Sequence, residues 1–514
     1  MEQFETVVAL LLAGAMLAAV ARRIGAPYPA LLALAGTVGA VVPGLPEVEL
    51  DPELALVLFV APALLDAAFD ASPRDLRDNL LPVGGLAVAA VLLTTAAVAV
   101  VARWLVPEMP WAAAVALGAI VAPPDAAAAS AVLRQVGLPH RLMVVLEGES
   151  LFNDATALLV FRMAVGAAAA GSFSPWEALP ALALTCGGGG ALGWALARLY
   201  AATAYRLFDE IGTAVLVQFL GTFGVWLLAE ALHVSAIITV VAYAMALARI
   251  VPVRTGARHR IASYAVWEVA VFVLNALAFI LIGLQLRGIL HRLAGDVREA
   301  LLFAGAACLV VVAVRFAWAM GANAFFRWQY GRYGPAAGAG RHLARPTLGG
   351  GIVISWCGMR GIVTLAAALA LPEGFPFRDL ILLTAFSVVL VTLVAQGLTL
   401  RWLLTRVQLP EDDSVEREVA LARAETARAA LAALDGAPER LREKYVARLR
   451  PAAEDGAGPS ALQAAAVEAQ RRRLDALRTD GSIGDTAFHL VEEEIDLLEL
   501  AADPRLRPGG AAAE

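Results

Sequence analysis

The chemistry that this sequence can support begins with ionisable side chains inside apolar runs. A charged side chain near the centre of a bilayer costs about 2.5 to 3.5 kcal/mol on insertion scales, so each such residue needs a reason. The residues in question are Asp66, Asp125, Glu147, Glu149, Asp154, Glu268, Arg162, Arg315 and Arg360. So dense a cluster of ionisable groups indicates a pathway for an ion or another polar substrate.

The first motif is Pro123-Pro124-Asp125, in the apolar run that begins near Trp111. Two consecutive prolines remove two backbone donors and restrict the residue before each of them, so the helix must break just before Asp125. Irregular backbone at membrane depth is tolerated where it lines a cavity. We therefore expect the backbone carbonyl of Pro124 to bind a cation beside the Asp125 carboxylate. The alternative is a simple proline kink, which leaves the aspartate unexplained.

The second motif lies in the next apolar run and contains Glu149, Ser150, Asn153 and Asp154. On a helix, Ser150 and Asp154 share one face at positions i and i+4, and Glu149 and Asn153 share the adjacent face. The oxygens of Asp154 and Ser150 are hard ligands of the kind that Na+ or K+ requires. We expect a monovalent metal ion to bind Asp154 together with Asp125. An ordinary helix N-terminus with acidic first-turn residues is the alternative.

The third motif is Gly358-Met359-Arg360-Gly361. Glycine permits unusual dihedral angles and a close approach of backbone, so a second broken helix is predicted here. Interrupted spans at corresponding positions of two halves of a chain are typical of a transporter site. These two lie seven spans apart and therefore cross the membrane in opposite directions, as inverted repeats require. We expect Arg360 to form a structural ion pair with Glu149 rather than to bind the cation.

The elements that must position these motifs are apolar helices of bilayer length. The chain has 514 residues, of which 60% are hydrophobic and 17% charged, and this composition excludes a soluble globular protein. Apolar runs separated by Pro, Gly and charged residues predict about thirteen transmembrane helices. They begin near Phe4, Tyr28, Glu53, Pro82, Trp111, Arg141, Trp176, Ile211, His233, Ala262, Glu299, Leu348 and Asp379.

Arginines in the connecting loops predict the orientation, because basic residues near span ends are retained on the cytoplasmic side. Alternate loops carry basic clusters such as Arg22 with Arg23, Arg74 with Arg77, and Arg254 with Arg258 and Arg260. The loops at 43–52 and 107–110 contain none. We expect a multi-pass protein of the cell membrane with its N-terminus outside and its C-terminus in the cytoplasm. Three arginines on the predicted outer side are exceptions to the rule: Arg287, Arg292 and Arg298.

Residues 411–514 have the pattern of a soluble, cytoplasmic helical tail. This segment contains 22 acidic and 14 basic residues, a net charge of −8, whereas residues 1–410 carry +2. Helices are predicted near 415–434, 460–477 and 486–500. Two interpretations remain open: a solvated tail of amphipathic helices, or a regulatory or self-association domain. The chain's three cysteines lack metal-ligand spacing and its basic residues form no stripe, so we predict no cofactor and no nucleic-acid partner.

Three strings of residues resemble the monovalent cation:proton antiporter family, whose bacterial members are Na+/H+ exchangers. They are Pro123-Pro124-Asp125, the string from Glu149 to Leu158, and Gly358-Met359-Arg360-Gly361; Trp267-Glu268 with Asn275 and Gly283 is also similar to that family. The resemblance covers residues 1–405 as a transmembrane antiporter domain. It implies inverted repeats, core helices at about 82–170 and 299–405, dimerisation helices at about 4–71 and 176–287, and a homodimer that moves ions by an elevator-like motion.

The resemblance also implies roles for single residues. Asp154 alternately binds a proton and a cation, Asp125 and Ser150 support it, and Asn153 is the neutral neighbour associated with electroneutral exchange. The sequence departs from the family pattern at two places. Many relatives have Thr-Asp-Pro where this chain has Pro124-Asp125-Ala126, so a threonine hydroxyl ligand is missing. A glutamate common in the third span has no counterpart at its position, and Asp66, one position away, is a candidate replacement.

The sequence therefore predicts a secondary antiporter, not an enzyme, that exchanges Na+ for H+ in pH homeostasis, with K+ and Li+ as alternative cations. Burial disfavours the charged form of a carboxyl group, so a buried aspartate can bind either a proton or a cation at physiological pH. A K+/H+ antiporter of the same fold is the first alternative. An intramembrane aspartyl hydrolase is more distant, because no Gly-x-Gly-Asp string accompanies Asp125 or Asp154. An ion channel would conduct without an exchanged partner ion.

Overall fold

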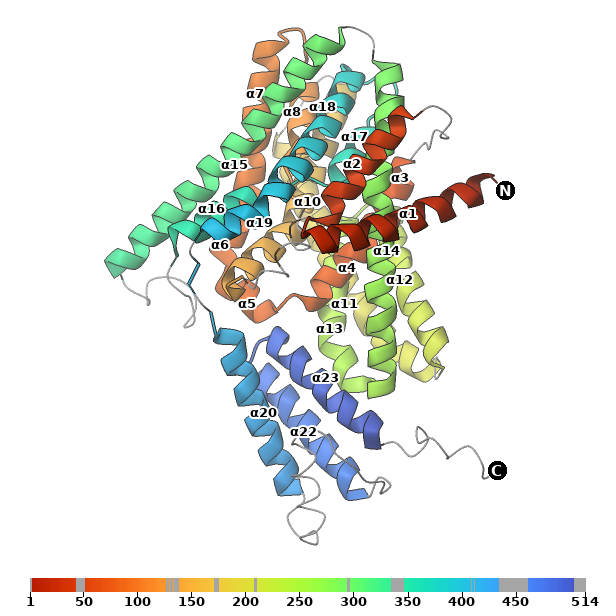
Figure 1. The fold of residues 1–514 in the computed structure, drawn as a ribbon, viewed down its shortest axis with the longest axis vertical. Coiled ribbons are helices and arrows are strands. Elements are labelled where there is room, and N and C mark those ends of the chain that lie inside the picture. The colour runs from red at the N-terminus through yellow and green to blue at the C-terminus, as the bar shows by residue number, and fades with distance from the viewer. Residues whose placement is uncertain are drawn as a thin grey trace.

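The computed structural model describes residues 2–42, 51–125, 138–170, 175–207, 210–293, 296–333, 346–407, 409–410, 412–433 and 461–502, together with Ala129 and Leu133. Every element within these residues is helical, and most of the helices form one elongated bundle (Figure 1). The prediction of an all-α polytopic membrane protein is therefore confirmed. The second half of the predicted fifth span, beyond Asp125, lies outside the described residues apart from Ala129 and Leu133.

The membrane domain, residues 2–407, consists of α-helices and short π-helical turns that are labelled η. Its first half contains α1 (Glu2–Ile24), α2 (Tyr28–Val41), α3 (Pro52–Ala55), η1 (Leu56–Val60), α4 (Ala61–Asp70), α5 (Pro73–Asp78), α6 (Leu80–Gly84), η2 (Gly85–Ala90), α7 (Val91–Leu105), α8 (Trp111–Val121) and α10 (His140–Ala170). Its second half contains α11 (Pro175–Leu207), α12 (Ile211–Ala231), α13 (Ala236–Arg254), α14 (Ala257–Arg292), α15 (Val297–Tyr333), α16 (Leu348–Trp356), α17 (Ile362–Leu369), α18 (Arg378–Val391), η3 (Thr392–Gln396) and α19 (Gly397–Arg406).

Seven helical stretches in the described residues are long and apolar enough to cross a membrane. They are Pro52–Asp70, Leu80–Leu105, His140–Ala170, Ile211–Ala231, Ala257–Arg292, Val297–Arg332 and Arg378–Arg406. Shorter apolar helices cover Tyr28–Val41, Trp111–Val121 and Ala236–Pro252. A helix begins within a few residues of every start that the sequence predicts, because Pro, Gly and charged residues interrupt the apolar runs at these places.

Two glycines bring α2 and α14 into close contact. A Cβ atom on Gly36 would lie 2.2 Å from the carbonyl oxygen of Ile280, and a Cβ on Gly283 would lie 2.3 Å from that of Ala33. Only a residue without a side chain allows backbones to approach this closely, as is common between membrane helices. Gly283, one of the residues that resemble the antiporter family, therefore has a packing role.

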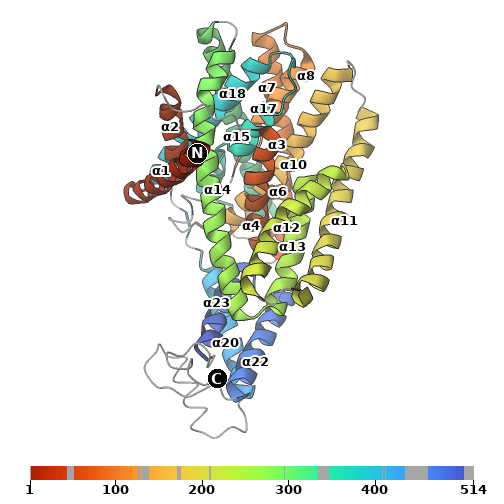
Figure 2. The same cartoon turned by 90° about the vertical axis from the view of Figure 1, so that its right-hand side faces the viewer.

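The loops separate to two ends of the molecule. Asp51, Arg292 and Glu373, near the ends of different helices, line one cavity at the end where α14 meets α15 (Figure 1). Arg74 and Arg260 lie at the opposite end, where they contact the C-terminal helices (Figure 2). The loops that contain Asp51, Arg292 and Glu373 thus lie at one end of the molecule, and those near Arg74 and Arg260 lie at the other.

The C-terminal bundle consists of α20 (Ser414–Ala433), α22 (Ala461–Thr479) and α23 (Asp485–Ala502). Its three helices coincide with the three that the sequence predicts. Their apolar faces form a separate small core that includes Val419, Leu474, Phe488 and Ile495. The helices are therefore packed on one another rather than individually solvated.

Candidate functional site

Two interrupted helices meet in the middle of the membrane domain, and we call this place the helix crossing. α8 ends at Val121 and residues 122–125 are not helical, while residues 357–361 separate α16 from α17. The backbone N–H of Asp125 donates to the carbonyl oxygen of Met359 at 2.7 Å, so the two interruptions touch. The break before Asp125 and the second broken helix at Arg360 are as the sequence predicts.

Gly361 makes room for the carboxylate of Asp125. A Cβ atom at Gly361 would lie 1.6 Å from Oδ2 of Asp125 and 2.5 Å from its Cγ. Gly361 precedes the first residue of α17, whose N-terminal end favours a negative charge. The second glycine of the motif therefore places a carboxylate at a helix N-terminus.

Asn153 ties the site helix α10 to the break in α8. Its side-chain amide donates to the carbonyl oxygen of Pro124 at 2.7 Å, and the side chain is fully buried. The carbonyl predicted to bind a cation therefore already accepts one hydrogen bond, and its second lone pair remains for a ligand. The Oδ1 atom of Asn153 is buried and has no hydrogen-bond partner.

Asp154 is the next residue on α10, and its side chain is only 8% exposed. It lies close enough to Asp125 for the two carboxylates to interact electrostatically. Ser150, one turn earlier on the same helix, is half-buried. Asp66 is half-buried on α4, a helix that packs against α10. The helix crossing and α10 together thus bring Asp125, Asn153 and Asp154 to one place.

The predicted ion pair between Glu149 and Arg360 is wrong. Both carboxylate oxygens of Glu149 accept from Arg315 on α15, with 2.9 Å between Nη2 and Oε2. Both side chains are almost completely buried. The physical reason is the packing of α15 against α16, where Arg315 also donates to the carbonyl of Ile354 at 3.0 Å. Sequence analysis counted Arg315 among the buried charges but gave it no partner.

Arg360 instead satisfies the open end of α8. Its Nε donates to the carbonyl of Val121 and its Nη2 to the carbonyl of Ala122, each at 3.1 Å, and Nη1 donates to the carbonyl of Gly358. The last carbonyls of a helix lack partners within the helix, and a positive charge there is favourable. Arg360 is therefore a fixed charge that stabilises the broken helix.

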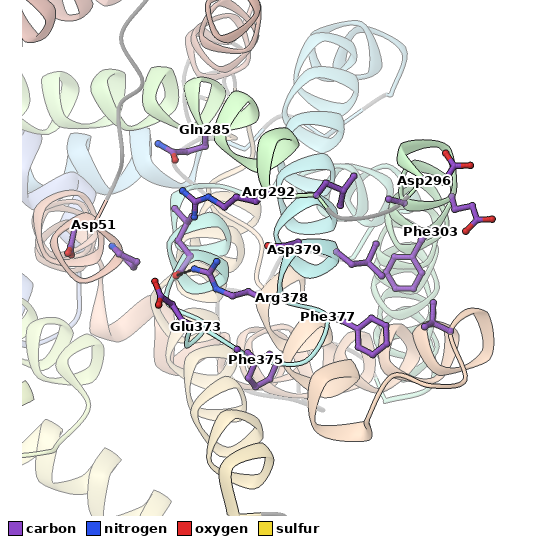
Figure 3. Close-up of a pocket in the computed structure, with 18 residues that line it drawn as sticks. Asp51, Gln285, Arg292, Asp296, Phe303, Glu373, Phe375, Phe377, Arg378 and Asp379 are labelled. Atoms are coloured by element: carbon purple, nitrogen blue, oxygen red, sulfur yellow. Dashed lines mark hydrogen bonds between the residues drawn. The ribbon is translucent and has the colours of Figure 1, made fainter.

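A cavity of about 1220 Å³ opens at the end of the molecule opposite to the C-terminal bundle (Figure 3). Its charged lining residues are Asp51, Arg292, Asp296, Glu299, Glu373, Arg378 and Asp379. Acidic side chains outnumber basic ones in this lining. Arg292, one of the three arginines on the predicted outer side, is therefore surrounded mainly by acidic residues. Neither Asp125 nor Asp154 lines this cavity. Sequence analysis missed it because the lining residues come from distant parts of the chain.

The donor set suits a monovalent cation. Within the described part of the chain, no three His, Cys, Asp or Glu side chains lie together in a way that could hold a metal ion. The candidate cation site consists of the carboxylates of Asp125 and Asp154, which lie close enough to interact, with neutral oxygens of Ser150 and Pro124 nearby in sequence. Hard oxygen ligands of this kind suit an alkali cation.

Comparisons with known proteins identify the family of this chain. A family model of transmembrane sodium/hydrogen exchangers matches residues 7–406. An uncharacterized Na+/H+ exchanger of Mycobacterium tuberculosis is 31% identical over 508 residues, covering 92% of this chain and 91% of that protein. A sodium, potassium, lithium and rubidium/H+ antiporter of Bacillus pumilus is 31% identical over 394 residues, covering 73% of this chain and 57% of that protein.

A solved structure shares the fold. The sodium proton antiporter MjNhaP1 from Methanocaldococcus jannaschii superposes with a TM-score of 0.60 at 18% identity, covering 79% of this chain and 99% of that one. The family match spans most of the chain, and the relatives are transporters. The chain therefore belongs to the sodium/hydrogen exchanger family of monovalent cation:proton antiporters, which are multi-pass membrane transporters and not enzymes.

Proposed function

We propose that the protein exchanges Na+ for H+ across the cell membrane and that Asp154 binds one cation or one proton in turn. The observation that carries this proposal is the isolation of the Asp154 carboxylate. It is buried, and among the described residues no basic side chain pairs with it. A buried charge without a partner costs several kcal/mol. The carboxylate therefore has to be neutralised by a proton or by a cation, and the two compete for it.

The remaining charges at the crossing support a one-for-one exchange. Arg315 neutralises Glu149, and Arg360 is held by backbone carbonyls, so neither has to change its charge during transport. The N-terminal end of α17 favours the charged form of Asp125, and Asn153 is neutral. Asp154 then carries one cation in one direction and one proton in the other, so no net charge crosses the membrane.

Na+ is the proposed cation, with K+ and Li+ as further candidates. The name of the Bacillus pumilus relative includes sodium, potassium, lithium and rubidium, which supports a site tolerant of cation size in that protein. Ser150 and the Pro124 carbonyl would complete the ligand set around Asp154 and Asp125. Asp66 is a candidate further ligand, and an Asp66→Asn variant tests it by a change in apparent cation affinity.

The proposed moving part is the core, about 82–170 and 299–405, beside dimerisation helices at about 4–71 and 176–287 in a homodimer. The core contains the whole crossing, so a cation bound to Asp154 would travel with it. We place the N-terminus outside and the C-terminal bundle in the cytoplasm, in line with the loop arginines. Exchange in this orientation would serve pH homeostasis.

The experiment is cation-driven proton movement in everted membrane vesicles. The Asp154→Asn variant keeps the shape of the side chain but has no site for a proton or a cation charge. We expect normal folding and complete loss of dequenching by Na+, K+ and Li+. Asp413→Asn is the matched control, because that aspartate is exposed on the C-terminal bundle. Normal dequenching by the Asp154→Asn variant refutes the proposal.

A further inference from the structure

The last span of the membrane domain, Arg378–Arg406, contains an irregular turn. α18 passes into the π-helical turn η3 (Thr392–Gln396) before the span continues as α19. Turns of this kind are rare, and they often lie at functional sites. The residues of η3 are Thr-Leu-Val-Ala-Gln, so the turn has no ionisable side chain of its own. Any role of η3 in exchange therefore lies in what it contacts.

The first residue of η3 holds the interruption between α16 and α17. The hydroxyl oxygen of Thr392 accepts a hydrogen bond from the backbone N–H of Arg360 at 3.0 Å. The same hydroxyl donates to the carbonyl oxygen of Val388, one turn earlier on α18, at 2.7 Å. A hydroxyl group can do both because it has one donor and two acceptor lone pairs. Thr392 thus connects the interruption to a regular helix.

The N–H that Thr392 accepts belongs to the peptide group that contacts Asp125. The carbonyl of Met359 and the N–H of Arg360 form one planar peptide unit. That carbonyl accepts from the backbone N–H of Asp125 at 2.7 Å. A single row of hydrogen bonds therefore runs from Asp125 through this peptide group to the Thr392 hydroxyl and on to Val388. Since Thr392 is fully buried, water does not compete for the row, and its members strengthen one another.

The last residue of η3 holds the other side of the same interruption. Trp356, at the end of α16, donates from its Nε1 to the carbonyl oxygen of Gln396 at 3.2 Å and to the hydroxyl of Thr399 at 3.0 Å. Thr392 and Gln396 are four positions apart and therefore lie on one side of their helix. Leu393 between them is buried in the main core. A firmly packed turn thus contacts the chain before and within the interruption.

We propose that η3 is a clamp on the interrupted helix and that Thr392 is a positioning residue for Asp125 in cation binding. This inference rests on the proposed exchange, in which Asp125 supports the cation at Asp154. Without the hydroxyl, the peptide group between Met359 and Arg360 is free to turn, and Asp125 moves with it. The signature is a raised apparent KM for the cation at a nearly unchanged maximal rate. A purely structural role would instead reduce the amount of active protein, and with it the maximal rate, at constant KM.

The test measures exchange against Na+ concentration for variants of the full chain in proteoliposomes that contain a pH-sensitive dye. Thr392→Val keeps the shape of the side chain but offers no acceptor to the N–H of Arg360. We expect its apparent KM for Na+ to rise about two- to tenfold, the range for one ordinary hydrogen bond. Thr392→Ser keeps the hydroxyl and should keep the KM. Thr384→Val is the matched control, because that buried hydroxyl bonds, among the described residues, only to the Leu380 carbonyl of its own helix.

Trp356→Phe tests the other side of the clamp. It keeps an aromatic ring against Phe316 but cannot donate to Gln396. We expect a KM rise of only about twofold, because Trp356 does not adjoin the peptide group that meets Asp125.

The outcomes separate the clamp from the exchange itself. An unchanged KM of Thr392→Val, or a rise that Thr392→Ser shares, overturns the positioning role. An unchanged KM of Trp356→Phe overturns the two-sided clamp, and this variant decides alone if Thr392→Val does not accumulate. Absence of cation-driven flux in the unaltered chain instead overturns the proposed exchange, and the positioning role with it.

Discussion

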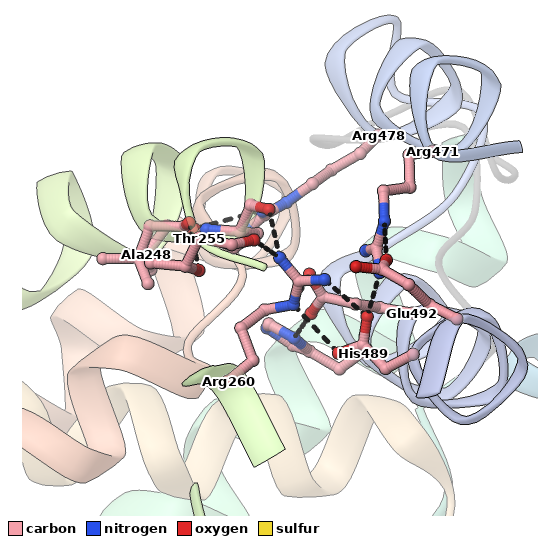
Figure 4. Close-up of polar contacts among 11 residues, drawn as sticks. Ala248, Thr255, Arg260, Arg471, Arg478, His489 and Glu492 are labelled. Atoms are coloured by element: carbon pink, nitrogen blue, oxygen red, sulfur yellow. Dashed lines mark hydrogen bonds and ion pairs between the residues drawn. The ribbon is translucent and has the colours of Figure 1, made fainter. Parts of the chain in front are cut away.

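The helix crossing and the contact of the C-terminal bundle with α13 and α14 both bury charged side chains, but they balance those charges differently. At this contact, Arg260 donates to Asp496 at 2.9 Å and Arg478 donates to the carbonyl oxygen of Ala248 at 3.1 Å (Figure 4). At the crossing, one carboxylate, that of Asp154, has no basic partner among the described residues. A surface that only has to hold together pairs all its charges, whereas a transport site leaves one charge for a mobile ion to neutralise.

Arginines show the same contrast in how they are used. Arg260 connects the membrane domain to the C-terminal bundle through its pair with Asp496. Arg315 and Arg360 act within the crossing, where they fix Glu149 and the end of α8. Because these fixed charges are satisfied internally, cation binding at Asp154 does not have to break them. The following changes test this division, from the largest expected effect to the smallest.

Removal of Arg315 should have the largest effect. The Arg315→Ala variant leaves Glu149 buried without a partner, and loss of one member of a buried pair costs about 3 to 5 kcal/mol of folding free energy. We expect a strong loss of protein yield and a lower midpoint of thermal unfolding in detergent. The double variant Arg315→Met with Glu149→Leu should recover most of the loss. The Glu149→Ala variant leaves its arginine partner unpaired, so a second substitution of that partner should restore the protein yield. If substitution of Arg360 restores it and substitution of Arg315 does not, the assigned pair is wrong.

Adding one methyl group at Gly361 should separate transport from folding. In the Gly361→Ala variant the new Cβ overlaps the Asp125 carboxylate, so the whole Asp125 side chain has to move. Overpacking of this kind costs about 1 to 3 kcal/mol, and the displaced carboxylate should reduce cation-driven flux far more than protein yield. Gly305→Ala on α15, where a Cβ meets no atom within 4 Å, is the control. Unimpaired exchange by Gly361→Ala contradicts the role given to Asp125.

Sequence analysis identified the helices and both interruptions because local chemistry determines them. The consecutive prolines Pro123 and Pro124 remove two backbone donors and so favour a break, and glycines on both sides of Arg360 permit a second one. The partner of Glu149 could not be predicted, since it depends on how α15 packs against α16. A buried pair leaves no pattern along a single chain that would distinguish Arg315 from Arg360.

The C-terminal bundle shows a second limit of sequence analysis. Glu492 and Asp496 lie on a charged amphipathic helix, and the same pattern of charges is typical of a solvated face. In the structure both are buried against Arg260. The interpretation as a solvated tail therefore fails for this face of α23, because an acidic face that meets water and one that meets a buried arginine have the same sequence.

An exposed ion pair within the C-terminal bundle should contribute much less to stability than the buried pair of Arg260 and Asp496. The side chains of Arg423 and Glu494 are 58% and 44% exposed. Surface pairs of this kind contribute at most about 1 kcal/mol, so Arg423→Ala should leave the unfolding midpoint and the exchange rate almost unchanged. Arg260→Ala, measured in parallel, should lower the midpoint clearly. Equal effects of the two variants would remove the distinction between a holding contact and a surface pair.

Acidification should slightly loosen the contact of α20 and the residues before it with Arg74 and His140. Burial disfavours the charge of Asp75, yet its hydrogen bond with His140 and the nearby Arg74 lower the pKa of this carboxyl below its ordinary 3.8. Burial likewise opposes the charge of Asp412, whose pKa is lowered by hydrogen bonds from Ser414 and from the backbone of His140. A carboxyl with a lowered pKa stabilises the folded contact above its ordinary pKa and loses that contribution as the pH falls.

The expected result is weaker protection of α20 from hydrogen exchange once the pH falls below about 4, after correction for the intrinsic exchange rate. The buried pair of Arg260 and Asp496 keeps α23 attached to α14, so α23 should lose less protection over the same range. Asp75→Asn removes one of the two titrating groups and should flatten the pH dependence of α20. A rise in α20 protection on acidification has the opposite sign and would mean that the carboxylates of Asp75 and Asp412 do not stabilise the docked bundle.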